Sequence, residues 1–176
     1  MSLQLLPAGP ADAPTIHELA HRIWWAHYPD IVSDGQITYM LERGYTVSAL
    51  KQQMAEGQQF WLLHQTENPD AIGYLSISAL ETPGHFFVHK FYIDNTQRGR
   101  GAGRQAFALL LKAYPQAEEI RLFVNRLNFK SINFYFRVGF QILRCMETPI
   151  GEGYLMVDYE MQWRKNRLNT TPETSL

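Results

Sequence analysis

Cysteine is the scarcest residue in this chain, and the chain has no large excess of positive or negative charge. The 176 residues include one cysteine, Cys145, which excludes an internal disulfide and favours a cytoplasmic protein. The 16 basic and 17 acidic side chains leave a net charge of −1, so the overall charge does not indicate a nucleic-acid partner. No apolar run approaches the roughly 18 residues of a membrane span, and we expect neither a membrane anchor nor a secretion signal.

The composition is that of one globular domain. Hydrophobic residues make up 45% of the chain and charged residues 19%, and the length allows a sizeable core. We expect a single domain over residues 1–164. The residues from Lys165 onward are polar, which predicts a disordered tail over residues 165–176.

Helical spacing dominates the N-terminal third. Apolar residues recur every three or four positions after Asp12, which we expect to cap the first helix, and Pro29 ends that segment. A second helix follows the potential cap Ser33. A third is expected over residues 47–56, with Gly57 as its stop.

Strand-like runs follow, with two more helices between them. A turn is expected at Asn68-Pro69-Asp70, and Gly151-Glu152-Gly153 separates a closing pair of strands. The expected strands are residues 3–6, 60–64, 72–79, 86–93, 120–124, 140–146 and 154–163, and the later helices are residues 105–114 and 130–138. This order predicts an α/β (α+β) fold with a mixed sheet. The strands on either side of the helix at 105–114 should be parallel neighbours joined by a right-handed crossover.

The stretch Gln97-Arg98-Gly99-Arg100-Gly101-Ala102-Gly103-Arg104 is a glycine-rich turn between an expected strand and an expected helix. Glycine lets the backbone approach an anion closely, and the free N–H groups and dipole of a helix N-terminus attract the anion. The stretch therefore predicts a phosphate site, against the alternative of a helix entrance with no ligand. It lacks both the Gly-Lys-Ser/Thr ending of an ATP-binding loop and the full dinucleotide fingerprint, so ATP and NAD are the less favoured phosphates.

A second motif directly follows an expected buried strand. It reads Asn128-Phe129-Lys130-Ser131-Ile132-Asn133-Phe134-Tyr135-Phe136-Arg137-Val138-Gly139-Phe140. The segment from Arg98 to Gly103 resembles the acetyl-CoA pyrophosphate loop of the GNAT superfamily of N-acetyltransferases, and this second motif resembles that superfamily's other signature. Both occur in the family's order, and Ser131 stands where the family often has alanine. The resemblance covers residues 86–140 and implies a GNAT-like fold, with a splayed parallel strand pair and helices on both faces of the sheet.

The resemblance implies acetyl-CoA as co-substrate and no metal. The pyrophosphate would lie on backbone N–H groups of the glycine loop, and the pantetheine arm would pair with the strand end Phe91-Tyr92-Ile93 like an added strand. Asn128 would hydrogen-bond the pantetheine or cap the helix that carries Tyr135. The implied donor-binding residues are Phe91, Tyr92, Ile93, Arg98, Gly99, Arg100, Gly101, Ala102, Gly103, Arg104, Asn128, Ser131 and Tyr135.

Three residues are the catalytic candidates that the resemblance implies. Tyr135 would protonate the leaving thiolate, against the alternative of a tyrosine that only packs. A bulge would aim a backbone N–H near Tyr92 at the thioester oxygen. His89 would be the general base, since its usual pKa near ~6.5 suits the task, with Glu81 or a water relay as alternatives. By alternation, His89 shares a face with Phe91 if no bulge intervenes.

The family builds its acceptor site from the first helices and the closing strands. In this region Trp25, Tyr28 and Tyr39 are the expected substrate-binding residues, because aromatic rings favour a cationic amine. Trp24 follows the apolar stripe and is expected in the core. The segment Tyr28-Pro29-Asp30-Ile31-Val32-Ser33 resembles the polyamine acetyltransferase-like branch. Small amines, polyamines, amino acids and peptide N-termini remain open as acceptors, and so does a homodimer through the edge of the last strand.

The implied function is an N-acetyltransferase that moves the acetyl group of acetyl-CoA to a primary amine of a small molecule or peptide, by direct attack in a ternary complex. Cys145 is a poor acyl carrier, because no histidine or carboxylate constellation near it in the sequence would activate the thiol. The alternative function is a non-catalytic acyl-CoA sensor of the same fold.

Overall fold

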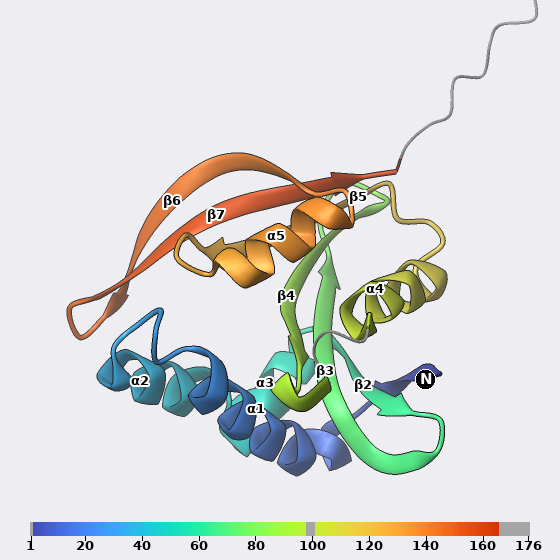
Figure 1. Ribbon diagram of the computed structural model, residues 1–176, viewed down its shortest axis with the longest axis horizontal. Coiled ribbons are helices and arrows are strands. Elements are labelled where there is room, and N and C mark those ends of the chain that lie inside the picture. The colour runs from blue at the N-terminus through green and yellow to red at the C-terminus, as the bar shows by residue number, and fades with distance from the viewer. Residues whose placement is uncertain (1, 98–100, 166–176) are drawn as a thin grey trace, which may run out of the picture.

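The computed structural model describes residues 2–97 and 101–165, which form a mixed sheet of order β1-β2-β3-β4-β5-β7-β6 (Figure 1). Arg98, Gly99, Arg100 and residues 166–176 of the expected tail lie outside the described residues. The strands are β1 (Leu3–Ala8), β2 (Gln59–Gln65), β3 (Asn68–Ala79), β4 (His85–Ile93), β5 (Glu119–Asn125), β6 (Gln141–Gly151) and β7 (Tyr154–Arg164). The helices are α1 (Ala13–His27), α2 (Asp34–Gly44), α3 (Val47–Ala55), α4 (Ala102–Ala113) and α5 (Phe129–Arg137), with short turns η1 (Pro10–Asp12) and η2 (Asn95–Gln97). Within these ranges, no helix is long and apolar enough to cross a membrane.

The helix starts of the N-terminal third follow from local capping. The Ser33 hydroxyl accepts the N–H of Gln36 at 3.2 Å, so the expected cap of α2 is confirmed. Asp12 occupies the position before α1, as expected. Its carboxylate, however, accepts the N–H of Gly9 at 2.8 Å and closes η1, so the prediction that this side chain caps α1 was wrong. The extra turn of η1 takes the carboxylate away from the first N–H groups of α1.

Two expectations about the strands were also wrong. β2 and β3 pair as far as Gln65 and Asn68, so the hairpin turns at Thr66 and Glu67 rather than at Asn68-Pro69-Asp70. The last strand, β7, lies between β5 and β6 and pairs with both. The edge at this end of the sheet is therefore β6, and β7 has no free edge at which a second copy could pair.

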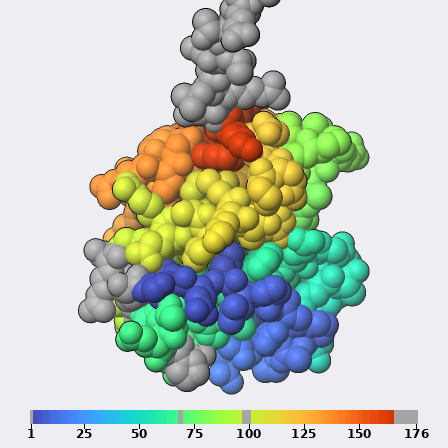
Figure 2. Space-filling model, turned by 90° about the vertical axis from the view of Figure 1, so that its right-hand side faces the viewer, coloured from blue at the N-terminus to red at the C-terminus, as the bar shows by residue number. Residues whose placement is uncertain are grey.

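Helices cover the two faces of the sheet over different strands. On one face, α4 and α5 pack against the core of the sheet, with residues such as Leu110, Ile120 and Met161 fully buried. On the other face, α1, α2 and α3 cover the N-terminal strands through residues such as Ile16 and Leu50. Figure 2 shows α4 (yellow-green) against the dark blue N-terminal strand β1. The expected α/β fold with a mixed sheet is confirmed.

The parallel strands β4 and β5 separate partway along their length. Their pairing begins at His85 and Glu119 and ends at Val88 and Leu122. β5 stays paired with β7 along its whole length, whereas the second half of β4 has no partner strand on its β5 side among the described residues. The expected parallel pair and its splay are thus both present, and a gap opens beside the end of β4.

One residue of β4, His89, is inserted as a bulge. Along β4, the pairing with β3 keeps one register up to Val88, which lies opposite Ile77, and another from Lys90 onward, which lies opposite Ser76. His89, between them, has no residue opposite it in β3. Because side chains alternate across a strand, the extra residue reverses the face that later residues occupy. Val88 and Phe91 consequently reach the same core, while His89 lies on the other face, with Nε2 2.8 Å from the Ser78 hydroxyl. His89 and Phe91 do not share a face.

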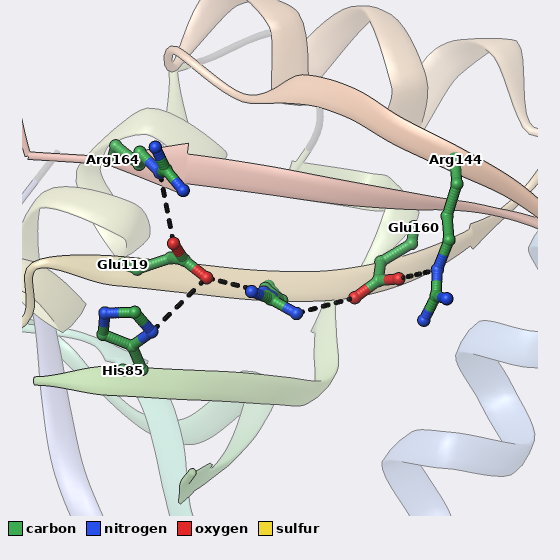
Figure 3. Close-up of polar contacts among 6 residues, drawn as sticks. His85, Glu119, Arg144, Glu160 and Arg164 are labelled. Carbon is green, nitrogen blue, oxygen red and sulfur yellow. Dashed lines mark hydrogen bonds and ion pairs between the residues drawn. The ribbon is translucent and has the colours of Figure 1, made fainter. Parts of the chain in front are cut away.

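Two buried carboxylates, Glu119 and Glu160, organise an ionic network on the face opposite α4 and α5 (Figure 3). Their side chains are only 3% and 4% exposed. Arg121 joins them, because its Nε donates to Glu119 at 2.6 Å and its Nη1 lies 3.5 Å from Oε1 of Glu160. The network is completed by His85 and Arg164 at Glu119 and by Arg144 at Glu160.

Replacing Glu119 by glutamine is expected to destabilise the protein in a pH-dependent way. Burial opposes ionisation of Glu119, but hydrogen bonds from Arg121 and Gln162 and the charges of Arg121 and His85 hold its pKa below the usual 4.5. An acid whose pKa is lowered by folding stabilises the fold above its unfolded pKa, and this contribution is lost as the pH falls through the folded value. Glu119→Gln should therefore lower the free energy of unfolding by about 1–3 kcal/mol at pH 7.

Urea unfolding at pH 7 and near pH 3 checks this expectation. The difference between wild type and Glu119→Gln should shrink at the lower pH, because the stabilisation by the ionised carboxylate is lost as the pH falls through the lowered pKa of Glu119. Exposed Glu42 in α2 serves as the matched control, and Glu42→Gln should change the free energy of unfolding by less than about 0.5 kcal/mol. An equal loss for Glu119→Gln at both pH values would show that its charge does not stabilise the fold.

Candidate active site

Two cavities adjoin where β4 and β5 separate. The first, here called the central cavity, has a volume of about 410 Å³ and lies between the splayed strand ends, α1, α2, α5 and β7. The second, here called the helix cavity, has a volume of about 510 Å³ and lies between the start of α4 and the length of α5. Phe91, Ile93 and Ser131 line both. Nowhere in the described part of the chain do three or more His, Cys, Asp or Glu side chains group as a metal site.

The start of α4 lines the helix cavity through residues 101–104. Gly101 directly precedes the helix with φ +76°, a conformation that favours glycine. A Cβ on Gly103 would lie 2.9 Å from the ring of Phe134, so this glycine is needed for α4 to pack on α5. Free N–H groups in the first turn of α4, together with the charge of Lys130 in the lining, suit the cavity to an anion.

Tyr135 of α5 reaches the central cavity from the α5 side of the sheet. Its ring packs against Phe91 and Phe140, at centroid distances of 6.5 and 5.4 Å. Burial raises the pKa of its hydroxyl far above the ordinary value of 10, so the phenol stays protonated at neutral pH. The side chain is therefore a potential proton donor facing the cavity.

Asn128 and Ser131 form the first turn of α5 and line the central cavity. The Asn128 side-chain oxygen accepts the N–H of Ser131 at 3.2 Å, which is the capping geometry. An amide has two further donors on its nitrogen. Capping therefore fixes Asn128, which is buried, and leaves its nitrogen to donate to a ligand.

The backbone of β4 presents hydrogen-bonding groups to the gap. The Asp94 N–H donates to the carbonyl oxygen of Ile72 at 2.8 Å, next to the opposed pair Gly73 and Ile93. In an antiparallel ladder, this pattern places the N–H of Tyr92 in a hydrogen bond with β3, and the N–H groups on either side of it point the other way. The free donors at the gap are thus those of Phe91 and Ile93. The expected bulge is present too, but at His89 rather than near Tyr92.

His89 lines the central cavity on the side opposite Tyr135. Desolvation first, and then the charge of Lys90, lower its pKa to about 4. The imidazole is therefore neutral at pH 7 and able to accept a proton, although a group with so low a pKa is a weak base. Glu81 lies in the turn at the far end of the β3–β4 hairpin and does not line this cavity.

The aromatic residues in and after α1 and α2 that line the central cavity are not the ones that the sequence predicted as substrate-binding, apart from Tyr28. Trp24 and Tyr28 line the central cavity, and the Tyr28 hydroxyl lies 3.3 Å from that of Tyr92. Trp25 is 42% exposed and lies outside the cavity lining. Tyr39 is also outside it, since its hydroxyl donates to the carbonyl oxygen of Ile150 at 2.5 Å and so holds α2 against the β6–β7 hairpin.

Asp158 of β7 is a cavity residue that the motifs did not indicate. It is 4% exposed and lies opposite Asn125 of β5. Burial raises the pKa of its carboxyl to about 6, even though the charge of Arg126 acts in the opposite direction. The signal in the sequence was a carboxylate between apolar residues of the last strand, but its significance depends on β7 lying beside β5.

The sequence matches a known family over most of its length. The model of the Acetyltransferase (GNAT) family matches residues 18–140. No curated protein sequence matches the chain.

Solved structures share the fold at low sequence identity. The PaiA N-acetyltransferase of Thermoplasma acidophilum, solved in complex with coenzyme A, has a TM-score of 0.76 at 19% identity, over 94% of this chain and 100% of that one. A GCN5-related N-acetyltransferase of Rhodopseudomonas palustris has a TM-score of 0.75 at 16% identity, over 94% and 97%. A chimera of the Vibrio cholerae spermidine N-acetyltransferase SpeG has a TM-score of 0.70 at 16% identity, over 93% and 96%.

Proposed function

This chain belongs to the GNAT family of acetyltransferases, and from that premise we propose that it transfers the acetyl group of acetyl-CoA to a primary amine of a small molecule or peptide, by direct attack in a ternary complex. The observation that carries the proposal is the junction of the two cavities along Phe91, Ile93 and Ser131. A helix start suited to an anion lies on one side of this junction, and a protonated tyrosine, Tyr135, lies on the other.

The helix cavity is proposed to hold the donor. The pyrophosphate of coenzyme A would accept hydrogen bonds from N–H groups at the start of α4, within residues 101–104. Arg98, Gly99 and Arg100, outside the described residues, complete the proposed loop. The structural neighbour PaiA, which was solved with coenzyme A bound, supports this choice of ligand.

The free donors of β4 are proposed to orient the pantetheine and the thioester. The glycine loop follows β4, so a coenzyme whose pyrophosphate lies at the loop runs back along the strand from Ile93 toward Phe91. Its thioester end then lies nearer Phe91. We infer that the Phe91 N–H, rather than that of Tyr92, donates to the thioester oxygen and stabilises the negative charge that develops there.

The reaction follows from these positions. The substrate ammonium first loses one proton to a base or to water, and its nitrogen lone pair then forms the C–N bond at the thioester carbon. When the tetrahedral intermediate collapses, the C–S bond breaks and the sulfur takes the proton of the Tyr135 hydroxyl. The amide nitrogen then gives up its extra proton, which came from the amine, to the Tyr135 oxygen and restores the phenol. The products are the N-acetylated amine and coenzyme A, and His89 is one candidate for the first base.

A thiol-release assay with acetyl-CoA and a panel of amines tests the proposal. We expect coenzyme A and N-acetylated amine to form in equal amounts, with initial-rate lines that intersect as a ternary complex requires. Parallel lines would instead indicate a covalent acyl-enzyme and contradict direct attack. Acetyl-CoA binding without thiol release on any amine would favour the non-catalytic sensor.

A further inference from the structure

The central cavity has an unusual charge inventory for a site that accepts amines. Among the described residues that line it, Asp158 is the one carboxylate, and neither lysine nor arginine is present. The two lining histidines are His27 and His89, and His89 is neutral at pH 7 because its pKa is lowered to about 4. The described walls therefore offer a bound molecule one negative charge and no permanent positive charge.

The Asp158 carboxylate is placed to meet a cation. The residue is 4% exposed, and no other described residue donates a hydrogen bond to its carboxylate. Its charge is felt by the buried hydroxyl of Tyr28, which also lines the cavity. The charge of Arg126 acts on this carboxylate, but the Arg126 guanidinium donates its hydrogen bond to Glu147 at 2.5 Å. A buried carboxylate without a hydrogen-bond donor is costly, and an ammonium group bound against Asp158 would supply the donors together with a further positive charge.

The remaining walls are mainly apolar. Aromatic rings come from α1 and the residue after it, from β4 and β5 and from α5, and aliphatic side chains from α1, α2, β4 and β5 complete them. The principal ring-bearing residues are Trp24, Tyr28, Phe87, Tyr92 and Phe123. A volume of about 410 Å³ is in the range of small-molecule sites. Such walls suit the hydrocarbon part of a ligand and leave further charged groups unpaired.

Building on the proposed function, we propose that the acceptor is a small monoamine with an apolar or aromatic body and no carboxylate, whose ammonium group binds Asp158. A polyamine would place additional ammonium groups in a cavity that has no second carboxylate to pair with them. An amino acid would bring its own carboxylate beside Asp158, with neither arginine nor lysine in the described lining to pair with it. Both would bury a charge without a partner, which is strongly unfavourable. The proposal separates this chain from the polyamine-like branch that the segment beginning at Tyr28 resembles.

Two pairs of probes, each differing in one charged group, test the acceptor class. Phenethylamine and phenylalanine differ by a carboxylate, and hexylamine and 1,6-diaminohexane differ by a second amine. With acetyl-CoA at pH 8, we expect kcat/KM to favour phenethylamine and hexylamine over their partners by on the order of 100-fold. A preference for phenylalanine or for 1,6-diaminohexane would overturn the acceptor class while leaving the acetyltransferase function intact.

A binding measurement without chemistry isolates the role of Asp158. Calorimetric titration of phenethylamine into the protein with coenzyme A present is expected to show about 30-fold or more weaker binding for Asp158→Asn than for wild type. Asp30, an exposed carboxylate after α1 that does not line the cavity, provides the control Asp30→Asn, which should bind like wild type. Equal loss in both variants, or no loss in Asp158→Asn, would overturn the proposal.

The two measurements separate the two levels of inference. If no amine releases thiol but phenethylamine binding still depends on Asp158, the acetyltransferase function fails and the ligand class stands. If thiol is released with polyamines or amino acids in preference to monoamines, the function stands and the ligand class fails.

Discussion

Replacing Tyr135 by phenylalanine is expected to lower turnover by about 10²–10⁴-fold, with the affinity for acetyl-CoA nearly unchanged. The substitution removes only the hydroxyl that would protonate the leaving sulfur and keeps the ring that packs against Phe91 and Phe140. In the wild type, burial keeps this hydroxyl protonated at neutral pH. The substitution therefore removes the form of the side chain that donates the proton. Steady-state kinetics and calorimetric titration with acetyl-CoA give the two quantities.

A second buried tyrosine provides the control for this experiment. The Tyr114 hydroxyl accepts from the Trp61 indole at 3.0 Å and donates to the Gln59 side chain, and the residue does not line either cavity. Tyr114→Phe should cost about 1–2 kcal/mol of stability and leave turnover unchanged, which is the reverse of the pattern for Tyr135→Phe. Full turnover in Tyr135→Phe would exclude it as the general acid.

Replacing Phe91 by proline is expected to lower kcat by about 10²–10³-fold, the usual effect of removing one oxyanion donor. Proline lacks the N–H group that we infer donates to the thioester oxygen. The same N–H is not part of the β3–β4 ladder, so proline removes no hydrogen bond from the sheet at this position. The experiment therefore tests one backbone donor rather than the whole strand.

Phe91→Ala is the matched variant, because it removes the ring and keeps the N–H. We expect Phe91→Ala to retain most of kcat, even though the lost ring lowers stability. Circular dichroism and thermal unfolding show whether Phe91→Pro remains folded. Equal kcat values for folded Phe91→Pro and Phe91→Ala would assign the catalytic loss to the ring and remove the N–H from the mechanism.

The geometry at the starts of α4 and α5 could be predicted because its signals are local. Gly101 precedes α4 in a left-handed conformation, and the side chain of Asn128 caps α5 by bonding the residue three positions later. These effects depend on neighbours in the sequence, so glycine and asparagine mark them directly. Even here α4 begins at Ala102 rather than at the expected Gln105, because helix starts are set by which turn first closes.

The proposed acceptor side depends on contacts between distant segments. Asp158 enters the cavity because β7 pairs with β5, and no local pattern marks that neighbourhood. Trp24 and Trp25 were assigned by the edge of an apolar stripe, and one position along a helix turns a side chain by about 100°. The stripe identified Trp24 as buried, but did not reveal that a cavity opens within the buried layer.

The extra residue at His89 places two consecutive side chains of β4, those of His89 and Lys90, on the same face of the sheet. Deleting one residue there would restore simple alternation with β3. Phe91, Tyr92 and Ile93 would keep their partners in β3 and therefore their present faces. A single-codon deletion of His89 is therefore expected to remove one residue from the wall of the central cavity and to leave the two faces of β4 unchanged. Homologous chains should be able to differ in residue number at this point without exchanging the side chains that line the two faces.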